Sequence, residues 1–243
     1  MNSRSILRYL GVLFALVLAV GCGGKLPQRG SAEFDKRLRE GEILVGTEDV
    51  EGTGLKVVRA MGWTDVPPDA VWEVFKDLNN LHTFLYRVEE SKELPMHGDK
   101  RVFRIVVNAP AVALAAGYDR MVMVAEIEES VSSDGTVRRA EFTSIQGNIK
   151  RAYGSWSVEN FGPDGKETLV TFSMFIDFGK TYIPDSTANY FVTDFLERWG
   201  DDLRNYAQDP NNRVKLEKAA ALRKGADPSE VGPKLDNIGD FLQ

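Results

Sequence analysis

Apolar and polar residues alternate through the middle of the chain, and this period of two predicts β-strands with one buried face. The alternation is clearest over residues 167–178, where apolar side chains occupy every second position from Val170 to Phe178. Short connections that contain Gly and Asp are typical of hairpins, so we expect neighbouring strands to pair antiparallel. Comparable runs bounded by turn residues predict further strands at 55–63, 86–93, 101–109, 118–129, 136–145 and 149–161.

A helical spacing of apolar residues replaces the alternation at three places. The two prolines at 67–68 open a short helix, because proline suits a first helical turn, and residues 81–86 predict a second short helix. After the last strand, a long helix is expected over residues 184–208, where an Asp-Pro pair ends it. Its apolar face is strongly aromatic, with side chains recurring every four residues at Phe191, Phe195 and Trp199.

The start of the chain has the layout of a secretory signal. Two arginines precede an apolar run over residues 10–21, which is too short to span a bilayer comfortably, and small residues come before the single cysteine, Cys22. Residues 19–22 resemble the lipobox of bacterial lipoproteins, in which residues 1–21 are removed and Cys22 becomes the lipidated first residue. A plain signal peptide followed by an incidental cysteine is the alternative. Gly23 resembles the residue found there in lipoproteins sorted to the outer membrane, so we expect an outer-membrane-anchored lipoprotein that faces the periplasm.

The rest of the sequence divides into three parts. Residues 22–40 have the Gly, Pro and polar content of a flexible tether. Residues 41–208 contain the predicted strands and helices and form the expected ligand-binding domain. Residues 209–243 include a short helical stretch at 214–223, and we expect them to form a loosely attached tail.

The composition is that of an ordinary globular protein with an acidic balance. The full chain has a formal net charge of −6, and removal of residues 1–21 leaves 28 basic against 36 acidic side chains. Nucleic-acid binding needs a basic face on the protein. The charge balance therefore argues against a nucleic-acid partner, and the sequence leaves any protein partner unidentified.

The order of the predicted elements resembles a known fold. A strand, two short helices, an antiparallel meander and a long C-terminal helix make up the α+β START-like helix-grip fold, in which a curved sheet wraps around the terminal helix. Residues 68–78 and 81–91 resemble the two short helices and the following strand in its polyketide cyclase and coenzyme Q-binding branch, and residues 153–157 resemble its Gly-Ser-Trp strand. The resemblance covers residues 53–208. It implies a cavity between sheet and helix for a lipophilic small molecule such as a quinone, a lipid or a polyketide.

The side chains expected to face this cavity include no ionisable group. Methionines among aromatic residues form an adaptable apolar wall. The same side chains are compatible with a filled core, because alternation alone does not distinguish a hollow interior from a packed one. The candidate ligand-binding residues are Met121, Met123, Trp156, Val170, Phe172, Met174, Phe191, Phe195 and Trp199.

The sequence gives little support for catalysis, a metal site or a cofactor. Its two histidines, His82 and His97, have no partner at metal-ligand spacing, and no Gly-rich phosphate loop or nucleophile elbow occurs. A cyclase mechanism would use Arg120, Arg151 or Tyr153 to polarise a polyketide carbonyl, but these residues also suit a solvated sheet face. We therefore expect no catalytic residue, no metal and no cofactor.

Three functions stay open, in order of preference. The first is binding or carriage of a lipophilic molecule by a membrane-anchored lipoprotein. The second is a polyketide cyclase or aromatase-like enzyme, and the third is an envelope protein-interaction module with a filled core. The connection at 109–117 is apolar where a hairpin connection is ordinarily polar, and it forms a hypothetical lip at the mouth of the cavity.

Overall fold

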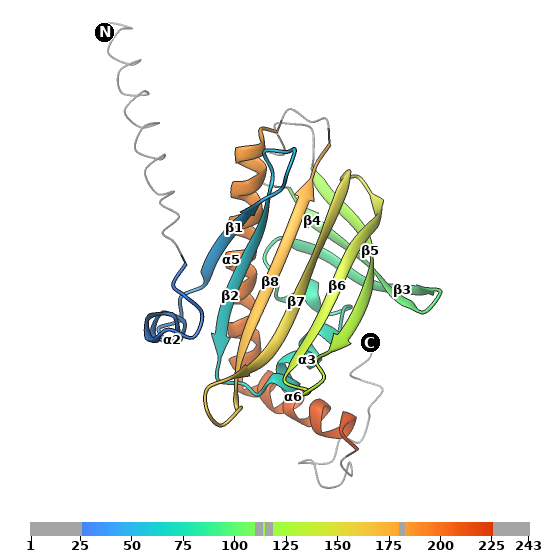
Figure 1. Cartoon of the computed structure of the whole chain (residues 1–243). Helices are drawn as coiled ribbons and strands as arrows, with labels where there is room; N and C mark the ends of the chain where they lie inside the picture. The colour runs from blue at the N-terminus through green and yellow to red at the C-terminus, as the bar shows by residue number, and fades with distance from the viewer. Residues whose placement is uncertain (1–25, 110–113, 115–118, 180–182, 226–243) are drawn as a thin grey trace, which may run out of the picture.

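The computed structural model describes residues 26–109, 114, 119–179 and 183–225, which form a curved antiparallel sheet alongside a long helix (Figure 1). The strands within these residues are β1 (Leu44–Asp49), β2 (Lys56–Thr64), β3 (Val88–His97), β4 (Lys100–Asn108), β5 (Arg120–Val131), β6 (Val137–Gly147), β7 (Arg151–Phe161) and β8 (Glu167–Asp177). The helices are α2 (Ala32–Arg39), α3 (Pro68–Lys76), the short 3-10 helix η1 (Leu81–Thr83), α5 (Asp185–Gln208) and α6 (Pro210–Arg223). None of these described helices is long and apolar enough to cross a membrane.

The strands lie in the order β1-β2-β8-β7-β6-β5-β4-β3, and each neighbouring pair is antiparallel. Strands β3 to β8 form a meander. Strand β2 pairs with β8 because α3 and η1 carry the chain from β2 to the opposite edge of the sheet, where β3 begins. This arrangement confirms the α+β helix-grip architecture expected from the sequence.

Alternation along the strands directs one set of side chains toward α5. In β7 and β8, Trp156 lies opposite Phe172 and Val158 lies opposite Val170, and all four side chains are buried. The intervening residues point to the other face of the sheet, because successive side chains of a strand alternate between faces. The apolar residues that alternate along the strands therefore form the inner face of the sheet, as their spacing of two predicted.

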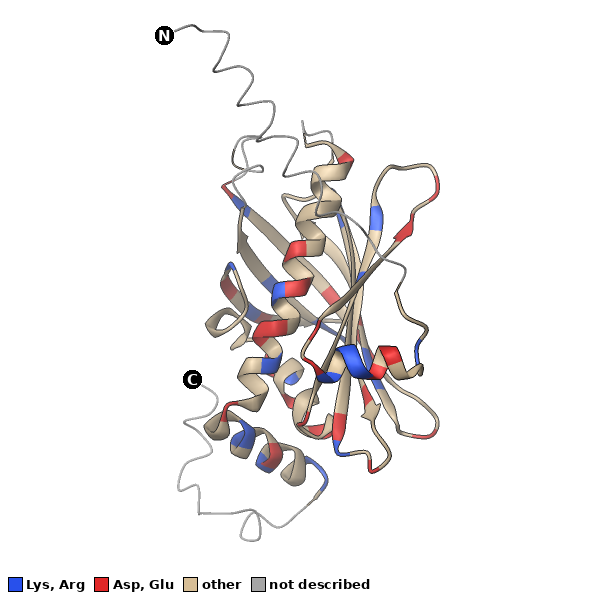
Figure 2. Ribbon diagram, turned by 90° about the vertical axis from the view of Figure 1, so that its left-hand side faces the viewer, with Lys and Arg blue, Asp and Glu red and all other residues tan. Residues whose placement is uncertain are grey.

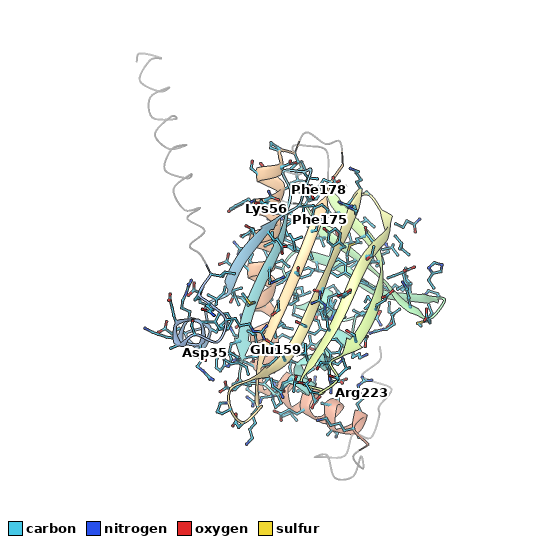
Figure 3. All side chains as sticks on the ribbon, viewed as in Figure 1. Asp35, Lys56, Glu159, Phe175, Phe178 and Arg223 are labelled. Carbon is cyan, nitrogen blue, oxygen red and sulfur yellow. The ribbon has the colours of Figure 1, made fainter. Side chains whose placement is uncertain are left out.

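Helix α5 supplies the other half of the core, packing mainly on β2 and β8. Its aromatic side chains form a row, with ring centroids 5.4 Å apart for Phe191 and Phe195 and 4.1 Å apart for Phe195 and Trp199. Phe178, labelled in Figure 3, extends this row beyond the end of β8, with its ring centroid 6.1 Å from that of Phe191. Charged side chains occupy the solvent side of α5 (Figure 2). The helix is thus amphipathic, as its sequence predicts.

Helix α2 lies inside the segment predicted to be a flexible tether, residues 22–40. The hydroxyl of Ser31 accepts a hydrogen bond from the Phe34 N–H (3.2 Å) and begins the helix. Phe34 and Leu38 are buried on the outer face of the sheet, against Leu44, Met61 and Leu169. The tether prediction is wrong over this helix, because two apolar residues four positions apart are enough to dock a short helix even among charged neighbours.

Strand β1 is a further element that the alternation did not predict. Its burial falls from a buried Leu44 to exposed residues at its far end, so it lacks a repeating apolar pattern. Its backbone pairs with β2, where Leu44 lies opposite Met61. Acidic side chains at Glu48 and Asp49 end this edge strand, a feature that discourages pairing with another chain.

The C-terminal region is also more firmly attached than the sequence predicts. The expected loose tail over 209–243 begins with α6, whose first turn is capped by the Asp209 carboxylate accepting from the backbone N–H groups of Asn211 and Asn212. Leu216 and Ala220 are buried against the domain, chiefly on the side of α3. The prediction of a loose tail is therefore wrong for α6.

An ion pair fastens the end of α6 to α3. Arg223, labelled in Figure 3, donates from Nε and Nη2 to the two carboxylate oxygens of Glu73, both at 2.7 Å. The Glu73 side chain is only 6% exposed, whereas that of Arg223 is 55% exposed. The carboxylate depends on this partner, because a buried charge is costly unless it is paired.

Replacement of Arg223 by alanine should lower the free energy of unfolding by about 2 kcal/mol, because the Glu73 carboxylate loses both hydrogen bonds. Urea denaturation of the two proteins measures this difference. The control is Lys224→Ala, which removes a more exposed ion pair with Asp69 and should cost less than about 1 kcal/mol. Equal effects of the two substitutions would contradict the proposed importance of the buried pair.

Candidate functional site

A cavity lies between the inner face of the sheet and α5. The centre of a water molecule can occupy about 40 Å³ of this cavity. All the gaps between the lining side chains, some of which are open to solvent, together measure about 590 Å³. The cavity is lined by Phe75, Leu81, Phe84, Leu85, Phe103, Ile105, Met123, Phe142, Ser155, Trp156, Phe172, Ser173, Met174, Leu196, Trp199 and Leu203. These residues include no ionisable side chain.

The cavity is small for a ligand. A single water needs about 10–15 Å³ on this measure, and an engineered apolar cavity that takes up benzene measures about 150 Å³. The domain therefore has an internal cavity, but the lining side chains fill most of the space between the sheet and α5. A hydrocarbon chain fits only if some of the lining side chains move.

Five of the nine predicted ligand-binding residues line this cavity: Met123, Trp156, Phe172, Met174 and Trp199. The other four are buried in the same core but lie elsewhere. Val170 borders a second, smaller hollow of about 10 Å³, and Phe172 borders both. Phe191 and Phe195 lie farther along α5 toward Phe178. Met121 is buried on β5 and does not line either hollow.

The sequence pattern did not predict a group of lining residues that come from outside the sheet. Phe75 comes from α3, and the turn that includes η1 contributes three more side chains. The helical spacing of Phe75 with Val71 and Leu78 indicated burial, but it did not indicate contact with the cavity. Three of the missed residues on the strands follow the same alternation as the predicted ones and could have been found by it: Phe103, Ile105 and Phe142.

Trp156 lies at the centre of an aromatic cluster. Its ring stacks on those of Phe75 and Phe142, with centroids 5.6 and 5.9 Å apart, and Phe103 meets it edge-on at 6.4 Å. Gly154 makes room for this arrangement, because a Cβ there would lie 2.8 Å from the Phe142 ring and 2.1 Å from a backbone oxygen. The Gly-Ser-Trp sequence thus places the large indole ring of Trp156 two positions from Gly154, which has no side chain.

The indole nitrogen of Trp156 has no hydrogen-bond partner among the described residues, although the atom is fully buried. A buried N–H left unpaired costs about 1–3 kcal/mol. Trp199, the other tryptophan of the lining, donates its indole N–H to the Tyr86 carbonyl at 3.1 Å. The two tryptophans of the cavity therefore differ in whether their polar group is satisfied.

The segment around η1 forms one wall of the cavity and is held to α5 by several contacts. The Asp202 carboxylate accepts a hydrogen bond from the Tyr86 N–H at 2.6 Å, next to the Trp199 contact. Phe84 stacks on Tyr206 with ring centroids 4.1 Å apart. Arg87, the residue after Tyr86, has a φ of 61°, in the left-handed region that non-glycine residues rarely adopt. This wall is therefore held to α5 by hydrogen bonds between side chains and backbone and by the stacking of two rings.

The residues considered for a cyclase mechanism lie away from the cavity. The Arg151 guanidinium lies over the rings of Tyr153 and Phe175, on the face of the sheet opposite Trp156. Arg120 forms a surface ion pair with Glu89. In the part of the chain that the structure describes, no group of three or more His, Cys, Asp or Glu side chains could hold a metal ion.

The two histidines also lie outside the lining. His82 is paired with Ser91, whose hydroxyl is 3.1 Å from the ring Nδ1. His97, the last residue of β3, is exposed as expected and is paired with Glu126. Cys22 and most of the hypothetical lip at 109–117 lie outside the described residues; of that lip, Leu114 is 53% exposed.

Comparison with known proteins identifies relatives of this architecture. A family model described as polyketide cyclase / dehydrase and lipid transport matches residues 64–204. The STAR-related lipid transfer protein from Xanthomonas axonopodis has a similar solved structure (TM-score 0.57, 21% identity), with 69% of this chain and 94% of that one covered. Human StAR-related lipid transfer protein 5 is similar at a TM-score of 0.53 and 13% identity, with 83% and 94% covered. No curated protein sequence matches.

Asp202 generates a prediction about pH. Burial raises the pKa of its carboxyl, the neighbouring Asp201 charge acts in the same direction, and the Tyr86 N–H opposes both. The folded protein therefore binds this proton more tightly than the unfolded chain, and the resulting stabilisation is lost as pH rises from about 4 through the folded pKa. Asp202→Asn should remove this dependence, so that the melting temperature of the variant gains on that of the wild type as pH rises through this window.

The control is Thr193→Val, on the same helix, which removes the hydrogen bond from the hydroxyl to the Asn189 carbonyl but no titratable group. Its difference from the wild type should not grow with pH in that window. Melting temperatures of all three proteins, measured between pH 3 and pH 8, test the prediction. A constant difference between Asp202→Asn and the wild type across the series would contradict it.

Proposed function

Because this chain belongs to the polyketide cyclase / dehydrase and lipid transport family, we propose that it binds an uncharged lipophilic small molecule between its sheet and α5. The observation that carries this proposal is the lining of the cavity, which is apolar apart from two serines and has no ionisable side chain. Such a lining favours hydrocarbon and disfavours ions. The solved structure from Xanthomonas axonopodis, described as a lipid transfer protein, supports the same class of ligand.

The energetics allow a ligand to open the closed interior. Each methylene transferred from water to an apolar site contributes about 0.8 kcal/mol, so ten methylenes contribute about 8 kcal/mol. Moving a few side chains between rotamers costs less than this. Met123 and Met174 are suited to such movement, because methionine is unbranched and adapts to irregular spaces.

The chemistry of the lining favours binding over catalysis. General acid–base catalysis of a cyclisation needs a titratable group within reach of the substrate, and the described lining offers none. The small volume is the observation that favours the other alternative, a filled core in a protein-interaction module. Ligand loading separates these two functions directly.

We further propose that the domain is attached to the outer membrane on its periplasmic side through a lipid on Cys22. The sequence pattern of residues 1–22 supports this proposal. Multiple acyl chains would give durable attachment, since a single chain binds membranes only weakly. In this arrangement the ligand is a lipophile of the bacterial envelope, such as a quinone or a lipid.

Met123→Trp should strongly weaken ligand binding, because the larger ring fills the space that the cavity offers. The mature domain is purified from its native membrane, extracted with solvent and analysed by mass spectrometry, and a fluorescent lipophilic probe is titrated into the stripped protein. We expect a stoichiometric lipophile in the wild type and at least tenfold weaker probe binding in the variant.

The control for this experiment is Met96→Trp, which makes the same change at a side chain that is 55% exposed on β3. It should bind the probe as the wild type does. An empty extract from the wild type, together with no probe binding, would contradict the proposed function and favour the filled-core alternative.

Replacement of Cys22 by serine should remove lipid attachment, because serine lacks the thiol that forms the bond to the lipid. When the full chain is expressed in a Gram-negative host with labelled palmitate, we expect label on the wild type and none on Cys22→Ser. The wild type should sediment with outer membranes until detergent is added. An unlabelled wild type in the soluble periplasmic fraction would contradict the anchoring proposal.

A further inference from the structure

The structure assigns to Trp156 a specific role that rests on the proposed function: its indole N–H donates a hydrogen bond to an uncharged acceptor oxygen in the buried part of the ligand. The ligand class is thereby narrowed from any lipophile to one that carries a ketone, quinone, ester or ether oxygen within its apolar body. Trp156 is then a specificity-determining residue of the cavity.

The first argument is that the indole N–H of Trp156 is an unpaired hydrogen-bond donor in an apolar site. Trp156 is 8% exposed, its Nε1 atom is buried, and the atom has no acceptor among the described residues. Buried polar groups in folded proteins are almost always paired. By contrast, the indole N–H groups of Trp63 and Trp199 donate to Glu167 and to the Tyr86 carbonyl, both at 3.1 Å.

The second argument is that the surroundings of Trp156 supply no substitute acceptor. Its ring neighbours are Phe75, Phe103 and Phe142, which have no oxygen. The two serines of the lining, Ser155 and Ser173, lie opposite each other and alternate with inward-facing residues, so they border the cavity through their backbone while their hydroxyls point to the other face of the sheet. An acceptor for the N–H must therefore come from a molecule that enters the cavity.

The third argument concerns charge. No lysine, arginine or histidine lines the cavity to neutralise an anion. Burial of a carboxylate or phosphate without a counter-charge is strongly unfavourable. The acceptor that reaches Trp156 is therefore neutral, and any charged headgroup stays outside the cavity.

Water is the competing source of an acceptor oxygen. The cavity has room for a few water molecules on the measure of about 10–15 Å³ each. A water held by one N–H among aromatic rings has few further partners, whereas an ordered internal water usually makes about three hydrogen bonds. A ligand oxygen needs only the single bond that Trp156 offers, so the site favours the ligand.

The test compares two uncharged probes, a linear alkane and the ketone of equal chain length with its carbonyl at mid-chain. Each probe displaces a fluorescent lipophile from the stripped mature protein. The ratio of ketone to alkane affinity is measured for the wild type, Trp156→Phe and Trp199→Phe. Comparing ratios among the three proteins cancels the different hydration of the two probes.

Trp199→Phe is the matched control, because it makes the same substitution in the same cavity at an indole whose N–H is already bonded to Tyr86. We expect the ratio to fall roughly threefold to tenfold in Trp156→Phe and to stay unchanged in Trp199→Phe. Equal ratios in all three proteins would overturn the assignment while leaving the proposed function intact. Failure of both probes to bind the wild type would overturn both.

A measurement on the wild type alone covers the case in which a variant misfolds. The indole N–H resonance of Trp156 is followed by proton–nitrogen NMR as ketone or alkane is added. A downfield proton shift with the ketone and none with the alkane supports the assignment. If the resonance responds equally to both probes, water or ring packing accounts for it, and the assignment is overturned.

Discussion

The contact between the aromatic face of α5 and the inner face of the sheet is the constraint on which the other features of the domain depend. Nine residues of the helix are buried, and the sheet meets them with side chains that alternate along each strand. A helix turns about 100° per residue. A shift of one residue in the helix would therefore rotate acidic side chains such as Asp194 toward the core. The aromatic row fixes the rotation of α5, and with it the position of the cavity.

Much of the fold follows from simple periodicities. The strands of the meander and the long helix each repeat a strong apolar pattern over many residues, so local sequence and final burial agree. α2 and β1 escaped prediction because their stability comes from contacts that are distant in sequence. Phe34 and Leu38 are buried against Leu169, which lies on β8 and is far from them in the sequence. A short pattern of two apolar residues has too little local information to predict such docking.

The site was predicted less completely than the fold, for a different physical reason. Alternation predicts which side chains face inward, and it placed Met123, Trp156 and Met174 on the correct face. Alternation does not predict where the side chains of the sheet and of α5 leave a void between them, because a void depends on side-chain volumes and on the curvature of the whole sheet. For the same reason Phe191 and Phe195 were expected at the cavity and instead pack along the helix. The unpaired indole is a tertiary property that only the structure displays.

The docking of the N-terminal segment limits how far the domain could travel from a lipid on Cys22. Leu26 already contacts the sheet near Gly46, since a Cβ at that glycine would lie 2.3 Å from the leucine side chain. If Cys22 carries the proposed lipid, only residues 23–25 separate the lipid-bearing residue from the folded body, and a chain of this length reaches at most about 14 Å. The 24-residue α5 is about 36 Å long. On the proposal of a lipid on Cys22, the folded body would therefore lie close to the bilayer, and a ligand would enter or leave the domain near the membrane surface.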